Sequence, residues 1–504
     1  MSDETAPVDP LGTPGAPVES QPEPTPKRTG RTVAIVIAAV VGALILIAGG
    51  AAAAFFLLSG RGPQPEVAMP ADTLGFVKID LDPSAGQKIN LARFVSSNLP
   101  KDAGFTVDPN SDNPFGDAID SSGILDGSGM TWAEVDAWAG DRAAIAAIPG
   151  NGSEPIPIVI VRVDDEDAMK AFFVKQDTTF AYAMVRDGYA VLAEDQGVVD
   201  RVRSSATWLS DDADYQFDLA QLGGGQLVTG WADLSGLSSL SSIAGSLIDT
   251  SAASDVAATG QVIFGLSAEP SVLEMRTVVT GASIDGHAVP ALSVANGLGS
   301  LPDGTVAGLS LANPGEWLQE ALKIAREQDQ GFVVDDLTSA TGLTEQQIID
   351  LLSTTITAFV MKNPAGLAEM PLVGVRVVAT DTSSEATWQD ALDTAGMPVA
   401  MDTVTGPDGK SYIYMRSTDG ADVLDQVKAA KGSLADSAAF AQVVPADATM
   451  SVFVDMAPVW DYLRQNDPTM NTYDGITAAG LAMTSSGTDP SVVTATLRVA
   501  FSGN

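Results

Sequence analysis

The sequence predicts an α+β fold in which a single N-terminal transmembrane helix precedes a duplicated ectodomain with largely antiparallel sheets and flanking helices. Three observations lead to this prediction: a long apolar run near the N-terminus, a turn-and-strand motif that recurs later, and Asp-Gly pairs between β-rich runs. A motif that recurs with constant spacing indicates internal duplication. Asp-Gly between two such runs is a strong hairpin signal, and hairpins beside helices are typical of α+β folds.

Residues 33–58 read VAIVIAAVVGALILIAGGAAAAFFLL and contain no charged, hydroxyl or amide side chain. About 20 apolar residues cross the roughly 30 Å hydrocarbon core, so this run predicts a membrane-spanning helix. Lys27, Arg28 and Arg31 precede it closely, whereas Arg61 alone follows closely. The positive-inside rule therefore places the N-terminus in the cytoplasm and the C-terminal domain outside the cell membrane. A cleavable signal peptide is the alternative, but its apolar region is shorter, about 7–15 residues.

The composition of the rest of the chain predicts a disordered tail and excludes several classes of protein. Residues 1–32 are rich in proline and poor in large apolar side chains, so we expect a disordered cytoplasmic tail, with 59–66 as a linker after the span. The net charge is −38, most of it beyond the predicted span, so the acidic ectodomain should not bind nucleic acid. The chain has no cysteine, which excludes a disulfide scaffold and a lipid-modified cysteine anchor.

The recurring motif begins at a proline. PADTLGFVKID at 70–80 returns as PADATMSVFVD at 445–455, and a shortened form, LPDGTVAGLSLA, begins at Leu301. Each copy reads as a turn followed by a strand. We expect the strand after each PAD turn to pair with the neighbouring repeat, which would make one continuous two-lobed sheet.

Other segments also occur in pairs. Thr131 precedes Glu134, and Thr344 precedes Gln347, by the three residues of a capping box. These pairs divide the ectodomain into repeat 1 at 67–281, a linker at 282–299, and repeat 2 at 300–504. We expect the following elements: a helix over 85–98, helices that begin after Thr131 and Thr344, strands over 157–163 and 371–377 with Arg162 and Arg376 in register, helices over 165–173 and 385–392, Asp-Gly hairpins at 187–188 and 408–409, helices around 198–202 and 423–427, and last strands that end near 281 and 503.

The segment LDPSAGQKINLARFVSSNLP at 81–100 resembles the opening signature of an uncharacterised, mainly actinobacterial membrane-anchored family catalogued as domain of unknown function 3352. Many members have a basic ending after the aromatic residue, where this chain has SSNLP. The resemblance implies the architecture of nearly the whole chain and no activity. A partner or ligand contact at this family-like motif would use Asp82, Pro83, Ser84, Gly86, Gln87, Lys88 and Arg93.

The same motif has a simpler structural interpretation. Asp82 or Ser84 would cap the following helix and Pro83 would occupy its first turn, which explains these residue types without any ligand. The functional alternative is that Lys88 and Arg93, which are rare positive charges on an acidic ectodomain, contact an anion or a protein partner.

Motifs for catalysis are scarce. His287 is the only histidine, and we interpret it as a turn residue between the repeats, because a catalytic triad or a zinc site needs further positioned ligands. The run GPDGKS at 406–411 ends like a phosphate-binding loop, but a strand-like alternation follows it where that loop requires a helix. No catalytic residue is predicted.

One loop supplies oxygen atoms at alternating positions. Its side chains could hold Ca²⁺, although the loop lacks the glycine and glutamate that an EF-hand requires. A polar loop without metal is the alternative, and no other cofactor is predicted. The calcium candidates are Asp108, Asn110, Asp112 and Asp117.

These observations favour a single-pass membrane protein with a non-enzymatic binding, sensory or scaffold ectodomain in the bacterial cell envelope. Its partners would be the plasma membrane, through 33–58, and an unknown envelope protein or a small hydrophobic ligand. Two alternatives stay open at this stage. The many carboxylates could include the pair of a cell-wall hydrolase, and a cavity between sheet and helices could carry a lipid-like ligand.

Overall fold

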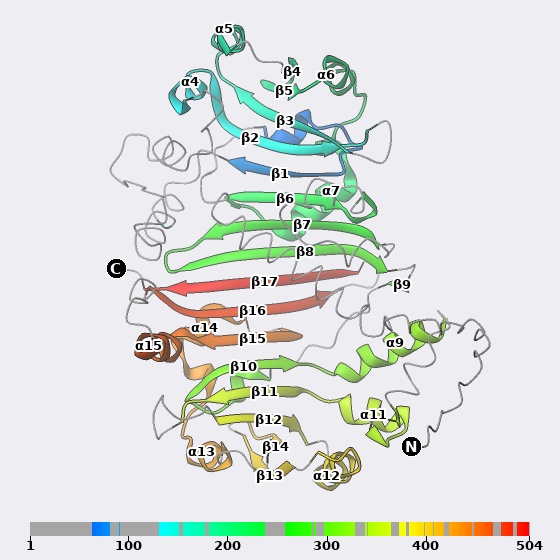
Figure 1. Cartoon of the computed structure of the whole chain (residues 1–504), viewed down its shortest axis with the longest axis vertical. Coiled ribbons are helices and arrows are strands. Elements are labelled where there is room, and N and C mark those ends of the chain that lie inside the picture. Colours follow the sequence, from blue (N-terminus) through cyan, green and yellow to red (C-terminus); the bar gives the residue numbers. More distant parts are fainter. Residues whose placement is uncertain are drawn as a thin grey trace, which may run out of the picture.

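The computed structural model consists of one large antiparallel sheet with helices packed along it (Figure 1), so the α+β prediction is confirmed at this level. Every strand pair among the described residues is antiparallel. The structure describes residues 63–80, 90, 131–150, 155–176, 181–236, 258–284, 287–288, 297–327, 338–339, 341–363, 372–379, 383–397, 399–406, 408–417, 423–445, 448–466, 475–486 and 491–502.

The sheet consists of two lobes with the same strand order. From the outer edge inwards, lobe one contains β4 (Ala181–Arg186), β5 (Tyr189–Ala193), β3 (Ile156–Val163), β2 (Ala139–Ile148), β1 (Gly75–Asp80), β6 (Val228–Asp233), β7 (Ala258–Ala268) and β8 (Val272–Ile284). In the corresponding order, lobe two contains β13 (Val399–Thr405), β14 (Ser411–Ser417), β12 (Leu372–Val378), β11 (Ile356–Met361), β10 (Thr305–Leu311), β15 (Met450–Asp455), β16 (Ile476–Ser486) and β17 (Val492–Phe501). The short β9 (His287–Ala288) pairs with the end of β8.

The lobes join through their last strands, β8 and β17. Arg276 of β8 lies opposite Thr496 of β17, and the registers of both lobes show that these two residues occupy equivalent positions. An approximate two-fold axis therefore passes beside this pair. One continuous two-lobed sheet does form, but the expectation that the strands after the PAD turns make the junction is wrong: β1 and β15 each lie inside their own lobe.

The structural counterpart of β1 is β10, and not the β15 strand that the longer PAD match suggested. Pro70 forms an isolated β-bridge with Trp208, and Pro302 forms one with Ser433. Each partner lies just before a short 3-10 turn in its lobe. Three residues after each proline, the hydroxyls of Thr73 and Thr305 donate hydrogen bonds to the carbonyl oxygens of those prolines, at 2.6 and 2.8 Å. The shortened motif at Leu301 is thus the true repeat, while PADATMSVFVD opens the strand equivalent to β6.

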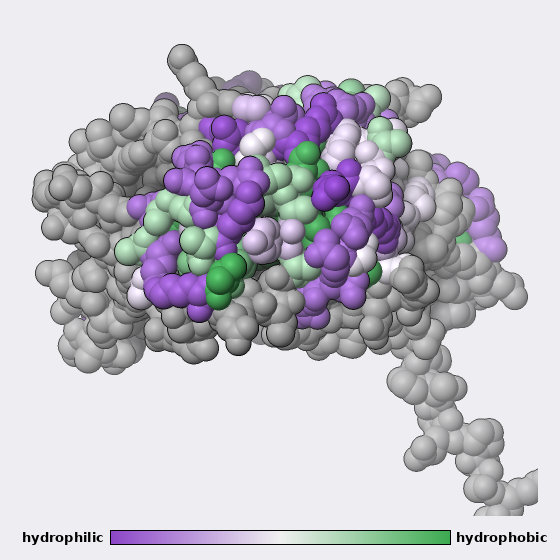
Figure 2. Space-filling model, turned by 90° about the horizontal axis from the view of Figure 1, so that it is seen from above, coloured by the Kyte–Doolittle hydropathy of each residue, from purple (hydrophilic) through white to green (hydrophobic). Residues whose placement is uncertain are grey.

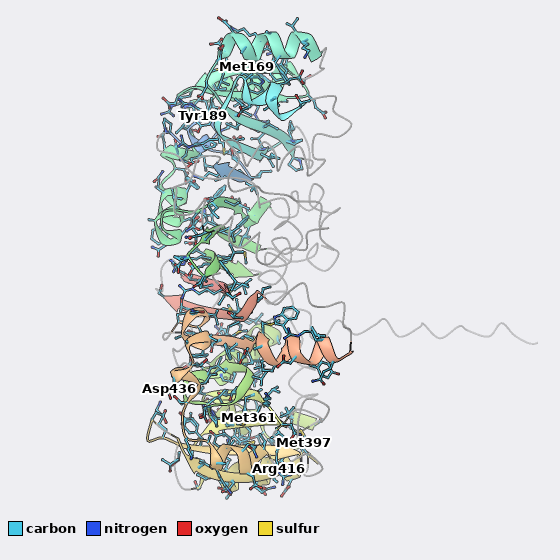
Figure 3. The ribbon with its side chains drawn as sticks, turned by 90° about the vertical axis from the view of Figure 1, so that its left-hand side faces the viewer. Met169, Tyr189, Met361, Met397, Arg416 and Asp436 are labelled. Carbon is cyan, nitrogen blue, oxygen red and sulfur yellow. The ribbon has the colours of Figure 1, made fainter. Side chains whose placement is uncertain are left out.

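Helices pack against the sheet in both lobes. In lobe one they are α4 (Trp132–Asp136), α5 (Glu166–Gln176), α6 (Gln196–Arg203) and α7 (Ala213–Leu222), with 3-10 turns η2 (Pro65–Ala68), η3 (Leu209–Asp211) and η4 (Leu234–Gly236). In lobe two they are α9 (Pro314–Glu327), α11 (Glu345–Leu352), α12 (Ser384–Thr394), α13 (Val423–Ala429), α14 (Ala438–Val443) and α15 (Met456–Asn466), with η5 (Leu298–Ser300) and η6 (Leu434–Asp436). Seen from the side, α14 lies against one face of the sheet and α15 projects from the other (Figure 3).

Several local predictions are confirmed. Both capping boxes form, at Thr131 with Glu134 and at Thr344 with Gln347. The hairpin of β4 and β5 turns at Asp187 and Gly188, whose φ angles of 52° and 81° favour these residue types. Asp408 and Gly409 lie between β13 and β14, so a strand follows Lys410 and the phosphate-loop reading is excluded.

Each lobe has its own core between the sheet and helices. In lobe one, Ile158 and Ile160 of β3 are fully buried at alternate positions, as the period of a strand requires, and they pack with Val199 of α6. In lobe two, Phe359, Phe453 and Phe440 form the corresponding cluster. Burying each large side chain contributes roughly 1.5–3 kcal/mol, so these two clusters supply most of the driving force for the fold.

The prediction that Arg162 and Arg376 lie in register is wrong, because the strand pairing of the two lobes matches Arg376 with Ile160, two residues before Arg162. Each guanidinium nevertheless lies 5.8 Å from the ring centre of a tyrosine on the next strand. Only Arg376 is fully buried, with 1% of its surface exposed. It donates to the carbonyl of Ser300 at 2.9 Å and to the hydroxyl of Tyr414 at 3.1 Å, and it stacks 4.1 Å from the ring centre of Tyr412. This arginine ties η5 to the sheet of lobe two.

Several predicted features lie outside the described residues: the tail at 1–32, the span at 33–58, the start of the linker at 59–66, and nearly all of the helix at 85–98. Among the helices that the structure does describe, none has the length and apolar character needed to cross a bilayer. The repeat boundaries stay a prediction, although β8 extends into the predicted linker at 282–299 and β9 lies within it.

Candidate functional site

The site residues predicted from the sequence do not come together in the described part of the chain. The family-like motif (Asp82, Pro83, Ser84, Gly86, Gln87, Lys88 and Arg93) and the calcium candidates (Asp108, Asn110, Asp112 and Asp117) all lie outside the described residues. His287 begins β9, where it pairs with Ile284. Within the described ranges, no three or more histidine or acidic side chains are grouped so that they could hold a metal ion.

A partly open pocket lies in lobe one. Its volume of about 520 Å³ lies within the range of roughly 300–1,000 Å³ that is usual for small-molecule sites. It is formed by η2, β1, α7, β6 and the loop between α7 and β6. Its polar lining consists of Gln64, Glu66, Lys78, Gln216, Gln226 and Thr229, and the remainder is Leu219, Ala220, Leu227 and three consecutive glycines, 223–225. We call it the lobe-one pocket.

A buried ion pair forms part of the pocket wall. Lys78 Nζ lies 2.9 Å from Glu66 Oε1 and 3.1 Å from Oε2, and only 8% and 4% of the two residues are exposed. The hydroxyl of Tyr215 on α7 donates to Glu66 Oε1 at 3.0 Å. Burial, together with the Glu66 charge, raises the pKa of Tyr215, so the phenol stays protonated and acts as a donor. We call these three residues the buried triad.

A second buried polar pair lies one helical turn further along α7. Asp218 is 1% exposed and accepts a 2.9 Å hydrogen bond from the indole N–H of Trp231 on β6. Burial raises the pKa of Asp218, and the hydrogen bond from Trp231 opposes that rise. The rings of Trp231 and Tyr215 meet edge to face, with centroids 5.9 Å apart. The pair therefore connects the triad to the sheet.

The loop after α7 forms the remaining wall. Gly223 and Gly225 have φ angles of 85° and 83°, which only glycine adopts without strain. Gln226 then packs over Gly265 of β7, where a Cβ atom would lie 2.5 Å from the Gln226 amide oxygen. That oxygen is buried and has no hydrogen-bond partner among the described residues. A buried acceptor left in this state costs about 1–3 kcal/mol, so Gln226 is a marked feature of the pocket.

The residues that run up to η2 are held firmly against lobe one. The hydroxyl of Tyr189 on β5 (labelled in Figure 3) donates to the carbonyl of Pro63 at 2.7 Å. Ala68 and Met69, just beyond Glu66, are fully buried in the core of lobe one. The pocket wall that carries Gln64 and Glu66 is therefore fixed at both ends.

Lobe two has the same backbone elements at the equivalent place but different side chains. The strand registers and the shared Pro-Thr turn match Glu66 with Leu298, Lys78 with Ser310 and Tyr215 with Phe440. Asp218 and Trp231 likewise correspond to Val443 and Phe453. Phe440 and Phe453 meet edge to face, as Tyr215 and Trp231 do. Within this matched set the charged groups belong to lobe one alone, and the hydroxyl of Ser310 is the hydrogen-bonding side chain in lobe two.

Sequence reasoning missed this pocket for two reasons. Glu66 lies at the end of the predicted linker, and the mistaken match of PAD motifs placed Lys78 opposite Phe453 instead of Ser310. One signal was present in the sequence. Lys78 stands two residues after Phe76 on the same strand, so both side chains must share the buried face of β1.

Comparisons with known proteins add little. No protein-family model matches the chain, and no curated protein does. A solved structure titled "Structure of crystal form IV of TP0453" is similar over 44% of this chain and 81% of its own, with 11% identity and a TM-score of 0.22. A likeness at that level carries no argument about fold or function.

Proposed function

We propose that this chain is a single-pass membrane protein of the bacterial cell envelope whose extracytoplasmic domain binds a small molecule, without catalysis, in the lobe-one pocket. The apolar run at 33–58 and the basic residues before it support the anchor and its orientation. The pocket volume and its convergent polar groups support the binding role. In this proposal the cytoplasmic tail and the ectodomain lie on opposite sides of the plasma membrane.

The observation that carries the proposal is the difference between the two lobes. Taking two charges out of water costs several kcal/mol for each ion, and apolar replacements of a buried ion pair are often neutral or stabilising. Lobe two builds the same arrangement of strand, 3-10 turn and helix around Leu298, Ser310 and Phe440. The fold therefore does not require a charged triad, and the triad in lobe one is best explained by a ligand.

The pocket lining favours binding over the two alternative functions. Glu66 is the only carboxylate among the lining residues, and it is neutralised by Lys78 at 2.9 Å. A hydrolase of the usual carboxylate type needs a second carboxyl group placed across the substrate. A lipid carrier needs a predominantly apolar cavity, whereas half of the lining residues here are charged or hydrogen-bonding side chains.

A lobe-swap variant tests the proposal. The substitutions Glu66→Leu, Lys78→Ser and Tyr215→Phe replace the buried triad with its lobe-two counterparts. Full-length protein released from membranes of its native host is compared with this variant by native mass spectrometry. We expect a discrete additional mass on the wild-type chain that is absent from the folded variant. A wild-type chain without added mass, or an added mass that survives the swap, contradicts binding in this pocket.

A further inference from the structure

We infer that the ligand of the lobe-one pocket is a neutral, hydroxyl-rich molecule of the saccharide class. This inference rests on the proposed binding function of the same pocket, and it concerns which chemistry the pocket recognises. It is drawn from the charge of the pocket, from one unpartnered acceptor and from the kind of hydrogen-bonding groups that line the walls.

The charge balance of the pocket disfavours an ionic ligand. Lys78 and Glu66 neutralise each other, and no other lining residue is charged. An anion would have to displace Glu66 from Lys78 and would also approach a chain with a net charge of −38. A cation would have to displace Lys78 from Glu66. A neutral ligand can instead use the outer hydrogen-bonding positions of an intact ion pair.

The buried amide oxygen of Gln226 requires a donor. It is enclosed, the Gln226 side chain that carries it fills the space over Gly265 that another side chain would take, and it has no partner in the described part of the chain. Lobe two has Ala448 and Ala482 at the matching positions, so this acceptor is another feature of lobe one alone. A ligand O–H or N–H would satisfy it and recover the cost of an unmade hydrogen bond.

The remaining polar lining suits hydroxyl groups. Gln64, Gln216 and Thr229 present groups that both donate and accept, as each sugar hydroxyl does. An extended peptide is a poorer fit, because β1 and β6, the strands that line the pocket, are already paired on both edges and offer no free strand edge for main-chain hydrogen bonds.

The test uses the full-length chain in a non-glycosidic detergent. Glucose, N-acetylglucosamine and trehalose serve as neutral probes, with glucose 6-phosphate, glucosamine and trialanine as the anionic, cationic and peptide probes. Binding is measured by saturation-transfer NMR and calorimetry. The test variant is Gln226→Met, which keeps the size of the side chain and removes the acceptor. The matched control is Gln442→Met, at an exposed glutamine on α14 of lobe two.

We expect at least one neutral saccharide to bind, Gln226→Met to raise its Kd by tenfold or more, and Gln442→Met to leave the Kd unchanged. Three results overturn the inference: no saccharide binding, saccharide binding that Gln226→Met does not weaken, or preference for a charged or peptide probe. If such a probe binds and the lobe-swap variant abolishes its binding, the binding function stands and only the ligand class is wrong. If no probe binds and native mass spectrometry finds no ligand, both proposals fail.

Discussion

Removing Lys78 alone should damage lobe one more than replacing the whole buried triad. The substitution Lys78→Met leaves the Glu66 carboxylate, 4% exposed, with Tyr215 as its hydrogen-bond donor in the triad. Breaking a buried ion pair by removing one partner costs about 3–5 kcal/mol, because an uncompensated charge remains. The lobe-swap variant removes the charges together, so its unfolding free energy should stay within about 1 kcal/mol of wild type or exceed it.

The assay is urea unfolding of the full-length chain at pH 7, followed by tryptophan fluorescence. Trp231 reports on lobe one directly, because its ring stacks on Phe76 at 6.3 Å and meets Tyr215 edge to face. With a urea m-value of about 1–3 kcal/mol/M, a loss of 3–5 kcal/mol lowers the midpoint by about 1 M or more. Equal destabilisation by Lys78→Met and by the lobe swap would refute the argument that the fold does not need the charges.

Three further predictions concern the buried arginine of lobe two, the buried aspartate of lobe one and the membrane topology. Arg376→Lys should destabilise lobe two by about 3 kcal/mol, because a lysine ammonium cannot make all the hydrogen bonds of the buried guanidinium. Arg162→Lys, on β3 of lobe one with a side chain that is 29% exposed, should cost under about 1 kcal/mol; paired urea curves measure both. Burial raises the pKa of the Asp218 carboxyl, so the folded state binds a proton there at a higher pH than the unfolded chain does. Ionisation of this carboxyl therefore destabilises the fold at pH 7, and Asp218→Asn should increase the unfolding free energy at that pH. That gain should vanish below about pH 4, the ordinary range of an aspartate pKa, and a gain that persists at pH 3 would contradict the cause. Finally, protease added to intact cells should leave an epitope tag in the tail at 1–32 uncut, and loss of that tag from intact cells would reverse the proposed topology.

Local patterns in the sequence predict much of the fold. The capping boxes at Thr131 and Thr344, and the Asp-Gly turn at 187–188, were found because each depends on a few neighbouring residues. The hydrophobic alternation of β3 likewise follows from the two-residue period of a strand. Such features need no knowledge of the rest of the chain.

The pairing of strands that lie far apart in the chain could not be predicted from the sequence. The longer PAD match joined β1 to β15 because the two segments share more of the motif, whereas the bridges of Pro70 and Pro302 and the strand pairing identify β10 as the counterpart of β1. The junction of the lobes at β8 and β17 depends on register over more than 200 residues of chain, as the pairing of Arg276 with Thr496 shows.

The candidate site was missed for the same reason. Glu66 and Tyr215 are 149 residues apart in sequence, and nothing local marks them as partners. The surface gives no simpler guide: seen from the end of lobe one, hydrophilic residues surround smaller apolar areas (Figure 2). Recognising the pocket required the strand register that places Lys78 and Glu66 together, and the comparison with Ser310 and Leu298, which occupy the matching positions of lobe two without charge.

The most direct measurement is an experimental structure of the full-length chain, purified from its native membrane without added ligand. We predict non-protein density in the lobe-one pocket, within hydrogen-bonding distance of the Gln226 amide oxygen and of Lys78, and none between η5, β10 and α14 in lobe two. A lobe-one pocket that holds only water, or that is filled by another segment of the same chain bound to Gln226, would contradict the proposal that lobe one is a binding site.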